Sequence, residues 1–137
     1  MHHHSICHRD IKPENILYDQ DRRSVILIDF GISKRVTDRN RRRDMMTVTG
    51  TPYYRAPEMF EGGGYDERVD LWALGVTLFK LMTGRTPFEA EYQLDTVRNI
   101  MEGQVVFPEE AAQKYSTPAR TLVCSLLKKK EKRLSAG

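Results

Sequence analysis

Two short apolar runs separated by polar residues lie near the start of the chain. Residues 16–18 and 25–28 are apolar and contain β-branched side chains, and the segment 19–23 between them is polar and turn-like. This pattern is typical of a small β-hairpin. Such a hairpin would place Asn15 and Asp29 at neighbouring ends of its two strands.

A much longer apolar block predicts a buried central helix. It begins at Asp66, which can cap a helix, has Glu67 in its first turn, and continues to about Met82. Apolar side chains cover nearly all faces of this stretch, and a helix that is apolar all round is usually buried. Gly84 and Pro87 would then end the helix.

Two shorter helices with apolar stripes are predicted after the central one, the first over about 91–102 and the second following 116–118. Their stripes comprise Leu94, Val97, Ile100 and Met101 in the first helix, and Leu122, Val123, Leu126 and Leu127 in the second. Lysines 128–130 fall at the C-terminal end of the second, where positive charge is favoured by about 0.3–1 kcal/mol. The predicted fold class is therefore mainly α with a small β-hairpin.

The composition suits one domain without a membrane segment. The 137 residues are 39% hydrophobic and 30% charged, and no apolar run approaches the roughly 20 residues that span a membrane. The N-terminus has no apolar stretch of signal-peptide length. Cys7 and Cys124 stand in unrelated contexts and are expected to be small buried residues instead of a disulfide. We therefore expect an intracellular, cytoplasmic protein that does not bind membranes.

Basic residues are concentrated at 39–43 and 128–133, and the net charge is +3. Basic runs attract nucleic acid, but no aromatic side chains that could stack on bases are interleaved, so no nucleic-acid partner is expected. Segment 32–50 is polar and predicts a loop. The histidines at 2–4 are either native residues or a short artificial tag; a metal site there is disfavoured because no second ligand cluster follows.

Three motifs follow one another in a specific order: His8-Arg9-Asp10 within segment 8–15, Asp29-Phe30-Gly31, and segment 50–58, which ends in Ala56-Pro57-Glu58. Each triplet alone is a weak signal, because three-letter strings recur by chance. Their order and spacing resemble the catalytic loop, the metal-binding loop and the end of the activation segment of eukaryotic protein kinases. The resemblance implies an activation segment over 29–58.

The resemblance covers essentially the whole chain and implies that residues 1–137 are a partial protein kinase domain. It starts just before the catalytic loop and stops near Arg133. The expected architecture is the C-terminal lobe of the kinase-like (α+β) fold, with the N-terminal lobe absent. The glycine-rich loop, the strand lysine and its partner glutamate are not found in the sequence, and the chain is expected to begin at an internal methionine.

The same resemblance implies the chemistry of phosphoryl transfer, with ATP and Mg²⁺ as cofactors. Asp10 would orient or accept the proton of the substrate hydroxyl, and Lys12 would hold the γ-phosphate as a point charge. Asn15 and Asp29 would hold magnesium, which prefers oxygen ligands. For any one of these residues, a solvated loop position is the alternative.

Two features indicate serine or threonine as the phosphorylated residue. Lys12 stands two residues after Asp10, and segment 50–52 reads Gly-Thr-Pro, as in serine/threonine members of the family. Thr51 would bridge Asp10 and Lys12 through its hydroxyl, and Glu14 is assigned with it to substrate positioning. A simple turn threonine is the alternative for Thr51.

The resemblance also implies that three further residues are structural. Asp70 matches the family's buried central helix, where it would accept hydrogen bonds from the catalytic-loop backbone. A partner is expected, because burying this carboxylate unpaired would cost several kcal/mol. Glu58 and Arg133 match the positions of a family ion pair.

Regulation by phosphorylation is also implied. Thr47 matches the phosphorylated activation-loop position, with Arg9 and Lys34 as the expected partners of the added negative charge. Thr49 is the competing site, and an unmodified loop threonine is the other alternative. An upstream activating kinase would be a partner.

Segments 29–35 and 133–136 look most like the calcium/calmodulin-dependent group, or its neighbour, the cyclic-nucleotide-dependent group. Segment 54–58 resembles the cyclin-dependent group, but that group's long insert is missing. The predicted function is a serine/threonine kinase that transfers the ATP γ-phosphate to protein hydroxyls, present as a fragment that is inactive alone. The alternative is a non-catalytic interaction module or decoy.

Overall fold

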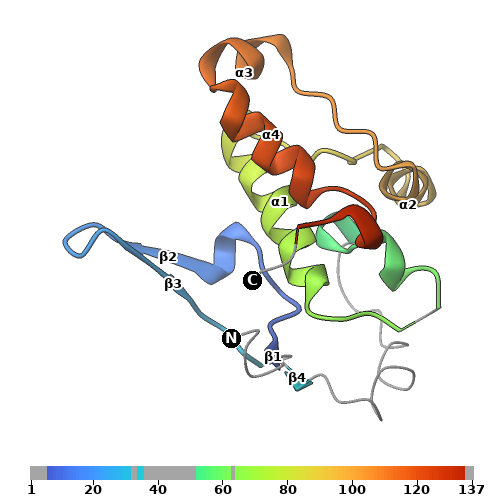
Figure 1. Cartoon of the computed structure of the whole chain (residues 1–137), viewed down its shortest axis with the longest axis horizontal. Helices are drawn as coiled ribbons and strands as arrows, with labels where there is room; N and C mark the ends of the chain where they lie inside the picture. The colour runs from blue at the N-terminus through green and yellow to red at the C-terminus, as the bar shows by residue number, and fades with distance from the viewer. Residues whose placement is uncertain (1–5, 32–33, 36–51, 63, 135–137) are drawn as a thin grey trace.

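The computed structural model describes residues 6–31, 34–35, 52–62 and 64–134. The long helix α1 (Arg68–Thr83) lies in the middle of the helical body, and a β-hairpin projects away from this body (Figure 1). The prediction of a mainly helical fold with a small hairpin is confirmed. The other elements are β1 (Ile6–Cys7), β2 (Ile16–Asp19), β3 (Ser24–Leu27), β4 (Lys34–Arg35), α2 (Gln93–Glu102), α3 (Glu109–Lys114), α4 (Thr117–Leu126) and short 3-10 turns.

The hairpin that the two apolar runs predict is present. β2 and β3 are antiparallel and pair Leu17 with Ile26, and the Ile28 N–H donates to the Asn15 carbonyl at 3.0 Å. The hairpin therefore brings the residue before β2 beside the end of β3, as expected for Asn15 and Asp29. A second small sheet pairs β1 with β4 and was not predicted. Its strands are two residues long, too short for a periodic signal.

The central helix is buried on most faces, but its capping differs from the prediction. The helix begins at Arg68, and Asp66 accepts the Arg68 N–H at 3.0 Å from outside the helix. Gly84 ends it in the left-handed conformation, with φ of 79°, and its N–H donates to the Lys80 carbonyl at 2.7 Å. Leu81 is 63% exposed, so the helix is not buried all round.

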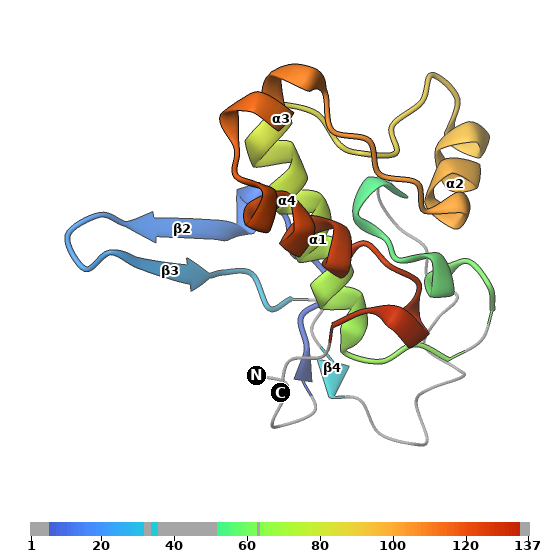
Figure 2. The same cartoon turned by 45° about the horizontal axis from the view of Figure 1, so that its top comes forward.

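Helix α4 lies along α1, as both views show (Figures 1 and 2). A Cβ atom at Gly75 would lie 2.9 Å from the Leu126 Cβ and 2.9 Å from the Leu127 Cγ, so glycine permits this close approach. Trp72, stacked on Phe88 with ring centroids 5.3 Å apart, belongs to the same core.

Two members of the predicted apolar stripes lie outside the core. Leu94 on α2 is 84% exposed, and Leu122 on α4 is 48% exposed. Thr96 and Ile100 are the fully buried residues of α2. Helix α3 was not predicted, because a six-residue helix offers less than two turns of pattern.

Both cysteines are free, as predicted; Cys7 is buried and Cys124 is partly buried. Burial, together with the neighbouring Asp70 carboxylate, raises the pKa of the Cys7 thiol, so this side chain stays neutral. Among the described residues, no helix is both long and apolar enough to cross a membrane.

Candidate active site

The loop that carries Asp10 is anchored to the central helix by one buried carboxylate. Asp70 is 2% exposed, and its two oxygens accept the backbone N–H groups of His8 and Arg9, each at 2.8 Å. These are the contacts expected for Asp70, and they offset the cost of burying its charge. Arg9 has a φ of 68°. The hydrogen bond from its N–H holds this strained backbone in place.

His8 ties the same loop to the end of the hairpin. Its ring is fully buried; Nε2 donates to the Ile28 carbonyl at 3.1 Å, while Nδ1 accepts the Asp10 N–H at 3.3 Å. These partners require the proton on Nε2. The ring also makes an edge contact with Phe30 at 4.8 Å between centroids. His8 therefore links Asp10 to the Asp29-Phe30-Gly31 segment.

Asp10 is held through one of its two carboxylate oxygens. The Asn15 Nδ2 donates to Asp10 Oδ2 at 2.9 Å and to the Asp10 carbonyl at 2.8 Å. The Lys12 Nζ lies 3.1 Å from the same Oδ2. Within the described parts of the chain, nothing donates to Asp10 Oδ1. The geometry brings together three of the predicted site residues and leaves one carboxylate oxygen for a further donor.

The predicted magnesium ligands meet the chemical requirement for such an ion. Because Asn15 uses Nδ2 for Asp10, its Oδ1 atom is left without a donor among the described residues. Asp29 is exposed, with a φ of 62°, and its Oδ1 accepts the Gly31 N–H at 3.1 Å. Amide and carboxylate oxygens suit Mg²⁺, which keeps several waters and shares ligands with bound phosphates. The described residues contain no cluster of three or more His, Cys, Asp or Glu metal ligands.

A cavity of about 1010 Å³ opens beside Asp10. Its walls come from segment 9–15, segment 53–59, one face of α1 and the stretch 84–89. Lys80 at the end of α1 donates to the Tyr54 hydroxyl at 3.2 Å, and its Nζ lies 3.9 Å from Glu14 Oε1. The hydrogen bond to Tyr54 raises the pKa of Lys80. Glu14, one of the predicted site residues, thus lines the cavity, and its side chain is 60% exposed.

Several predicted residues fall outside what the structure describes. Thr47, Thr51 and most of segment 29–58 lie outside the described residues. The backbone of Lys34 pairs with that of Cys7 in the β1–β4 sheet, and Cys7 lies two residues before Arg9 in the sequence.

Two tyrosines at the site had no predicted role. The Arg9 Nη1 donates to the Tyr65 hydroxyl at 3.4 Å, and Tyr54 is the hydrogen-bond partner of Lys80. Nothing in the local sequence indicated these contacts, because each joins residues 26 or more positions apart. Arg55 also lines the cavity, and burial lowers the pKa of its guanidinium.

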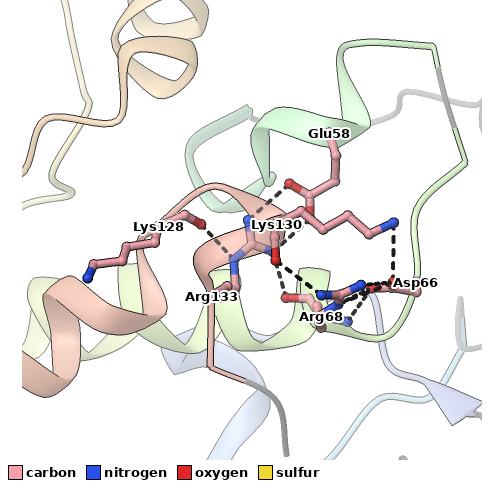
Figure 3. A network of polar contacts seen from close by, with 6 residues as sticks. All are labelled: Glu58, Asp66, Arg68, Lys128, Lys130 and Arg133. Atoms are coloured by element: carbon pink, nitrogen blue, oxygen red, sulfur yellow. Dashed lines mark hydrogen bonds and ion pairs between the residues drawn. The ribbon is translucent and has the colours of Figure 1, made fainter.

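A separate polar network joins the end of segment 52–59 to the C-terminal end of the described chain (Figure 3). Arg133 donates to both Glu58 oxygens, at 2.7 and 3.0 Å, and both side chains are buried. This is the expected ion pair. Arg133 also donates to the Lys128 and Arg68 carbonyls, each at 2.9 Å. These acceptors help offset the cost of burying the guanidinium charge.

The second half of the network centres on Asp66. Its carboxylate accepts from Arg68 at 2.9 Å and lies 3.2 Å from the Lys130 Nζ. Burial by itself would raise the pKa of Asp66, but the hydrogen bonds from Arg68 and Lys130 lower it to about 2. The Arg68 Nη1 donates to the Lys130 carbonyl at 3.1 Å, closing the network.

The whole chain, residues 1–137, matches the family described as the protein kinase domain. It is 45% identical over 111 residues to a cGMP-dependent protein kinase of Plasmodium berghei (strain Anka), covering 80% of this chain and 12% of that protein. It is 37% identical over 126 residues to the calcium/calmodulin-dependent protein kinase cmkB of Emericella nidulans, covering 90% and 31%. It is 38% identical over 140 residues to a calcium/calmodulin-dependent protein kinase type I of Schizosaccharomyces pombe (strain 972 / ATCC 24843), covering 100% and 42%.

The chain therefore belongs to the protein kinase domain family. The prediction of a protein kinase is confirmed at this level. The chain spans less than half the length of these three relatives.

Proposed function

We propose that this chain supplies the catalytic loop and the substrate-binding side of a serine/threonine protein kinase. The parent activity would transfer the γ-phosphate of ATP to serine or threonine hydroxyls of proteins. The observation that carries the proposal is the state of Asp10: one carboxylate oxygen is fixed by Asn15 and Lys12, and the other is open beside a large cavity. The helical architecture supports assigning the chain to the C-terminal lobe of the kinase fold.

The proposed reaction uses the chain for positioning and for handling one proton. The substrate oxygen forms a bond to the γ-phosphorus while the bond from that phosphorus to the ADP oxygen breaks. Asp10 Oδ1 accepts the proton of the attacking hydroxyl, because Oδ2 is already occupied by Asn15 and Lys12. Lys12, held at 3.1 Å from Asp10, would place its positive charge on the transferred phosphate.

Asn15 and Asp29 would hold magnesium in this proposal. Bound magnesium would neutralise phosphate charge and orient the phosphates for in-line transfer. The hairpin supports this role, because the Ile28 N–H to Asn15 carbonyl bond keeps the start of β2 beside the end of β3. The positive φ of Asp29 changes the direction of the backbone directly after this contact.

We further propose that the 137 residues do not turn over ATP by themselves. The sequence contains no glycine-rich loop to cover the phosphates, and two protein ligands alone hold magnesium weakly. A non-catalytic interaction module is the second candidate. The exposed apolar side chains of the hairpin, which give the isolated chain a surface for a partner, favour it.

Regulation through segment 29–58 is a third part of the proposal. A phosphate on Thr47 would add about −1.5 to −2 charge at pH 7 and pair with Arg9 and Lys34. Thr51 would position substrate by bridging Asp10 and Lys12. Replacing Thr47 with alanine should lower the activity of a completed kinase after treatment with an activating kinase, whereas full activity of that variant would exclude Thr47 as the switch.

For the subgroup, we propose the calcium/calmodulin-dependent kinases, with the cyclic-nucleotide-dependent kinases as runner-up. Two relatives of the first kind match over 90% and 100% of the chain. A relative of the second kind has the higher identity, 45%, over a shorter stretch of 111 residues.

The test completes the kinase and then removes the proposed catalytic group. The nucleotide-binding lobe of a protein kinase would be fused ahead of this chain. Magnesium-dependent phosphorylation of a serine peptide would then be measured. Asp10→Asn should reduce the rate by about 10²–10⁴-fold, and Asp29→Ala should abolish the magnesium-dependent phosphorylation. Asp21→Asn, an exposed turn residue, is the matched control and should keep full activity. A folded fusion without activity, or one insensitive to Asp10→Asn, would leave the interaction module as the better explanation.

A further inference from the structure

Three Thr-Pro dipeptides occur in the chain, beginning at Thr51, Thr86 and Thr117, and a threonine followed by proline is the pattern that proline-directed kinases modify. Thr51 lies outside the described residues. Thr86 is 6% exposed, and its hydroxyl donates to Glu89 Oε2 at 3.0 Å. Thr117, in contrast, is exposed and occupies the first position of α4. Of the two dipeptides that the structure describes, only the one at Thr117 is therefore open to an enzyme.

The backbone ahead of Thr117 is already extended. Tyr115 has φ and ψ of −109° and 139°, and Ser116 has −61° and 152°. The start of α4 is held by the Arg120 N–H, which donates to the Ser116 carbonyl at 3.2 Å. Terminal turns of helices fray readily. The segment around Thr117 can therefore take up the extended form that a kinase binds.

A guanidinium group lies beside the Thr117 hydroxyl. The Arg120 Nη2 donates to Thr117 Oγ1 at 3.2 Å. The Nε of the same side chain is buried and has no hydrogen-bond partner among the described residues. Two neighbouring N–H groups of a guanidinium can bind two oxygens of one phosphate, and a buried N–H without an acceptor costs free energy. A phosphate attached to Thr117 would supply the missing acceptor.

We propose that Thr117 is a phosphorylation site for a proline-directed serine/threonine kinase, and that Arg120 holds the phosphate at the start of α4. Thr117 Oγ1 forms a bond to the γ-phosphorus of ATP bound by that kinase, while the bond from this phosphorus to the ADP oxygen breaks. The hydroxyl proton passes to the modifying enzyme. The proposal concerns modification of this chain by another enzyme, and it does not rest on the catalytic role proposed for Asp10.

The added phosphate should stabilise α4. It carries about −1.5 to −2 charge at pH 7, and negative charge is favourable in the first turn of a helix. Because α4 lies along α1 (Figures 1 and 2), a more stable α4 should stabilise the helical body. We expect phosphorylation to raise the melting temperature by about 1–4 °C at low ionic strength. The rise should shrink in high salt.

The first test incubates the 137-residue chain with magnesium, ATP and a proline-directed kinase, and maps the phosphate by mass spectrometry. Thr117 should be modified in the folded chain, whereas the buried Thr86 should not. Pro118→Ala keeps a residue that suits the first turn of a helix and should abolish modification of Thr117. Thr121, which is exposed and followed by leucine, is the matched control and should stay unmodified.

Three results would overturn the site. The first is a folded chain in which Thr117 stays unmodified, even where a peptide of residues 112–122 is modified, since α4 would then shield the hydroxyl. The second is unchanged modification of Thr117 in Pro118→Ala. The third is phosphate on Ser116 in place of Thr117.

A second measurement tests the role of Arg120. Melting temperatures of purified phosphorylated and unphosphorylated chains are compared for wild type, Arg120→Gln and Arg98→Gln, the last being an exposed control on α2. Phosphorylation should raise the wild-type and control values alike, and Arg120→Gln should lose most of the rise. An equal rise in Arg120→Gln, or a fall in the wild type, would overturn the pairing of the phosphate with Arg120.

Discussion

Three short polar side chains hold backbone or charged groups in place: those of Asp66, Asp70 and Asn15. Asp70 holds two loop N–H groups at 2.8 Å, while Asn15 holds the Asp10 carboxylate. Short side chains suit this work, because little rotamer entropy is lost when they are fixed. At the residue scale, the site thus depends on hydrogen bonds to backbone and carboxylate groups.

The lowered pKa of Asp66 predicts a defined pH dependence of stability. Its folded-state pKa of about 2 lies below the ordinary value of 3.8, so the ionised form stabilises the fold. This contribution is complete above about pH 4 and is lost as the pH falls toward 2. Asp66→Asn should lower the urea midpoint at pH 6 and reduce the further loss between pH 4 and 3. Chemical denaturation at these pH values, with Asp21→Asn as the exposed control, measures the effect. An equal pH slope in Asp66→Asn and wild type would contradict it.

At the element scale, two features hold the helices together: a buried ion pair between two short turns, and the close approach of α4 to α1 at Gly75. The Glu58–Arg133 pair connects the turn at Pro57–Met59 with the turn at Lys130–Lys132, which are far apart in the chain. Gly75 lets α4 approach α1 closely. The turns are therefore positioned by a buried ion pair, and the two helices by a glycine that has no side chain to keep them apart.

Breaking the buried pair should be costly. Glu58→Ala leaves the Arg133 guanidinium buried without its carboxylate, and removing one partner of such a pair typically costs about 3–5 kcal/mol. The free energy of unfolding, measured in urea, gives the value. Arg98→Ala removes the exposed pair with Asp95, whose atoms are 3.0 Å apart, and should cost under about 1 kcal/mol. Equal costs for the two variants would show that burial does not govern the Glu58 pair.

Adding one methyl group at Gly75 should also destabilise the fold. The new Cβ would lie 2.9 Å from Leu126 and Leu127 atoms, and such overpacking typically costs about 1–3 kcal/mol. Ala73→Gly within the same helix is a useful comparison, since it loses helix propensity without adding atoms and should cost about 1 kcal/mol. A stabilised Gly75→Ala variant would mean that α4 shifts at little cost.

At the scale of the whole molecule, the hairpin extends from the helical body and leaves apolar side chains uncovered (Figures 1 and 2). Leu17 and Ile26, which face each other across the strands, are 50% and 47% exposed. Tyr18 and Val25, the next pair, are 66% and 64% exposed. Because successive pairs point to opposite faces of a ribbon, both faces of the hairpin carry exposed apolar surface.

This surface should make the isolated chain self-associate and bind hydrophobic dyes. Replacing both Leu17 and Ile26 with threonine keeps strand propensity, and should lower dye fluorescence and shift sedimentation toward the monomer. Leu94→Thr changes an 84% exposed leucine on α2 and serves as the matched control with a smaller effect. If the control and the double variant behave alike, the association does not depend on the hairpin.

Local sequence determined the elements whose signals lie within a few residues. The hairpin followed from two apolar runs around a polar turn, and the end of α1 followed from Gly84, which adopts a φ of 79°. The three motifs placed the chain in its family before any geometry was known, because motif order does not depend on packing. The sequence did not predict short elements such as α3, since six residues give too little periodicity.

Tertiary structure decided which of several equivalent residues are buried and which polar groups meet. Leu94 and Ile100 belong to the same predicted stripe, yet one is 84% exposed and the other fully buried, because only part of α2 faces the core. The contact of Lys80 with Tyr54 and Glu14 joins residues that are distant in the chain. Such contacts depend on how α1 packs against the loop that carries Asp10, and no local pattern of side chains encodes that packing.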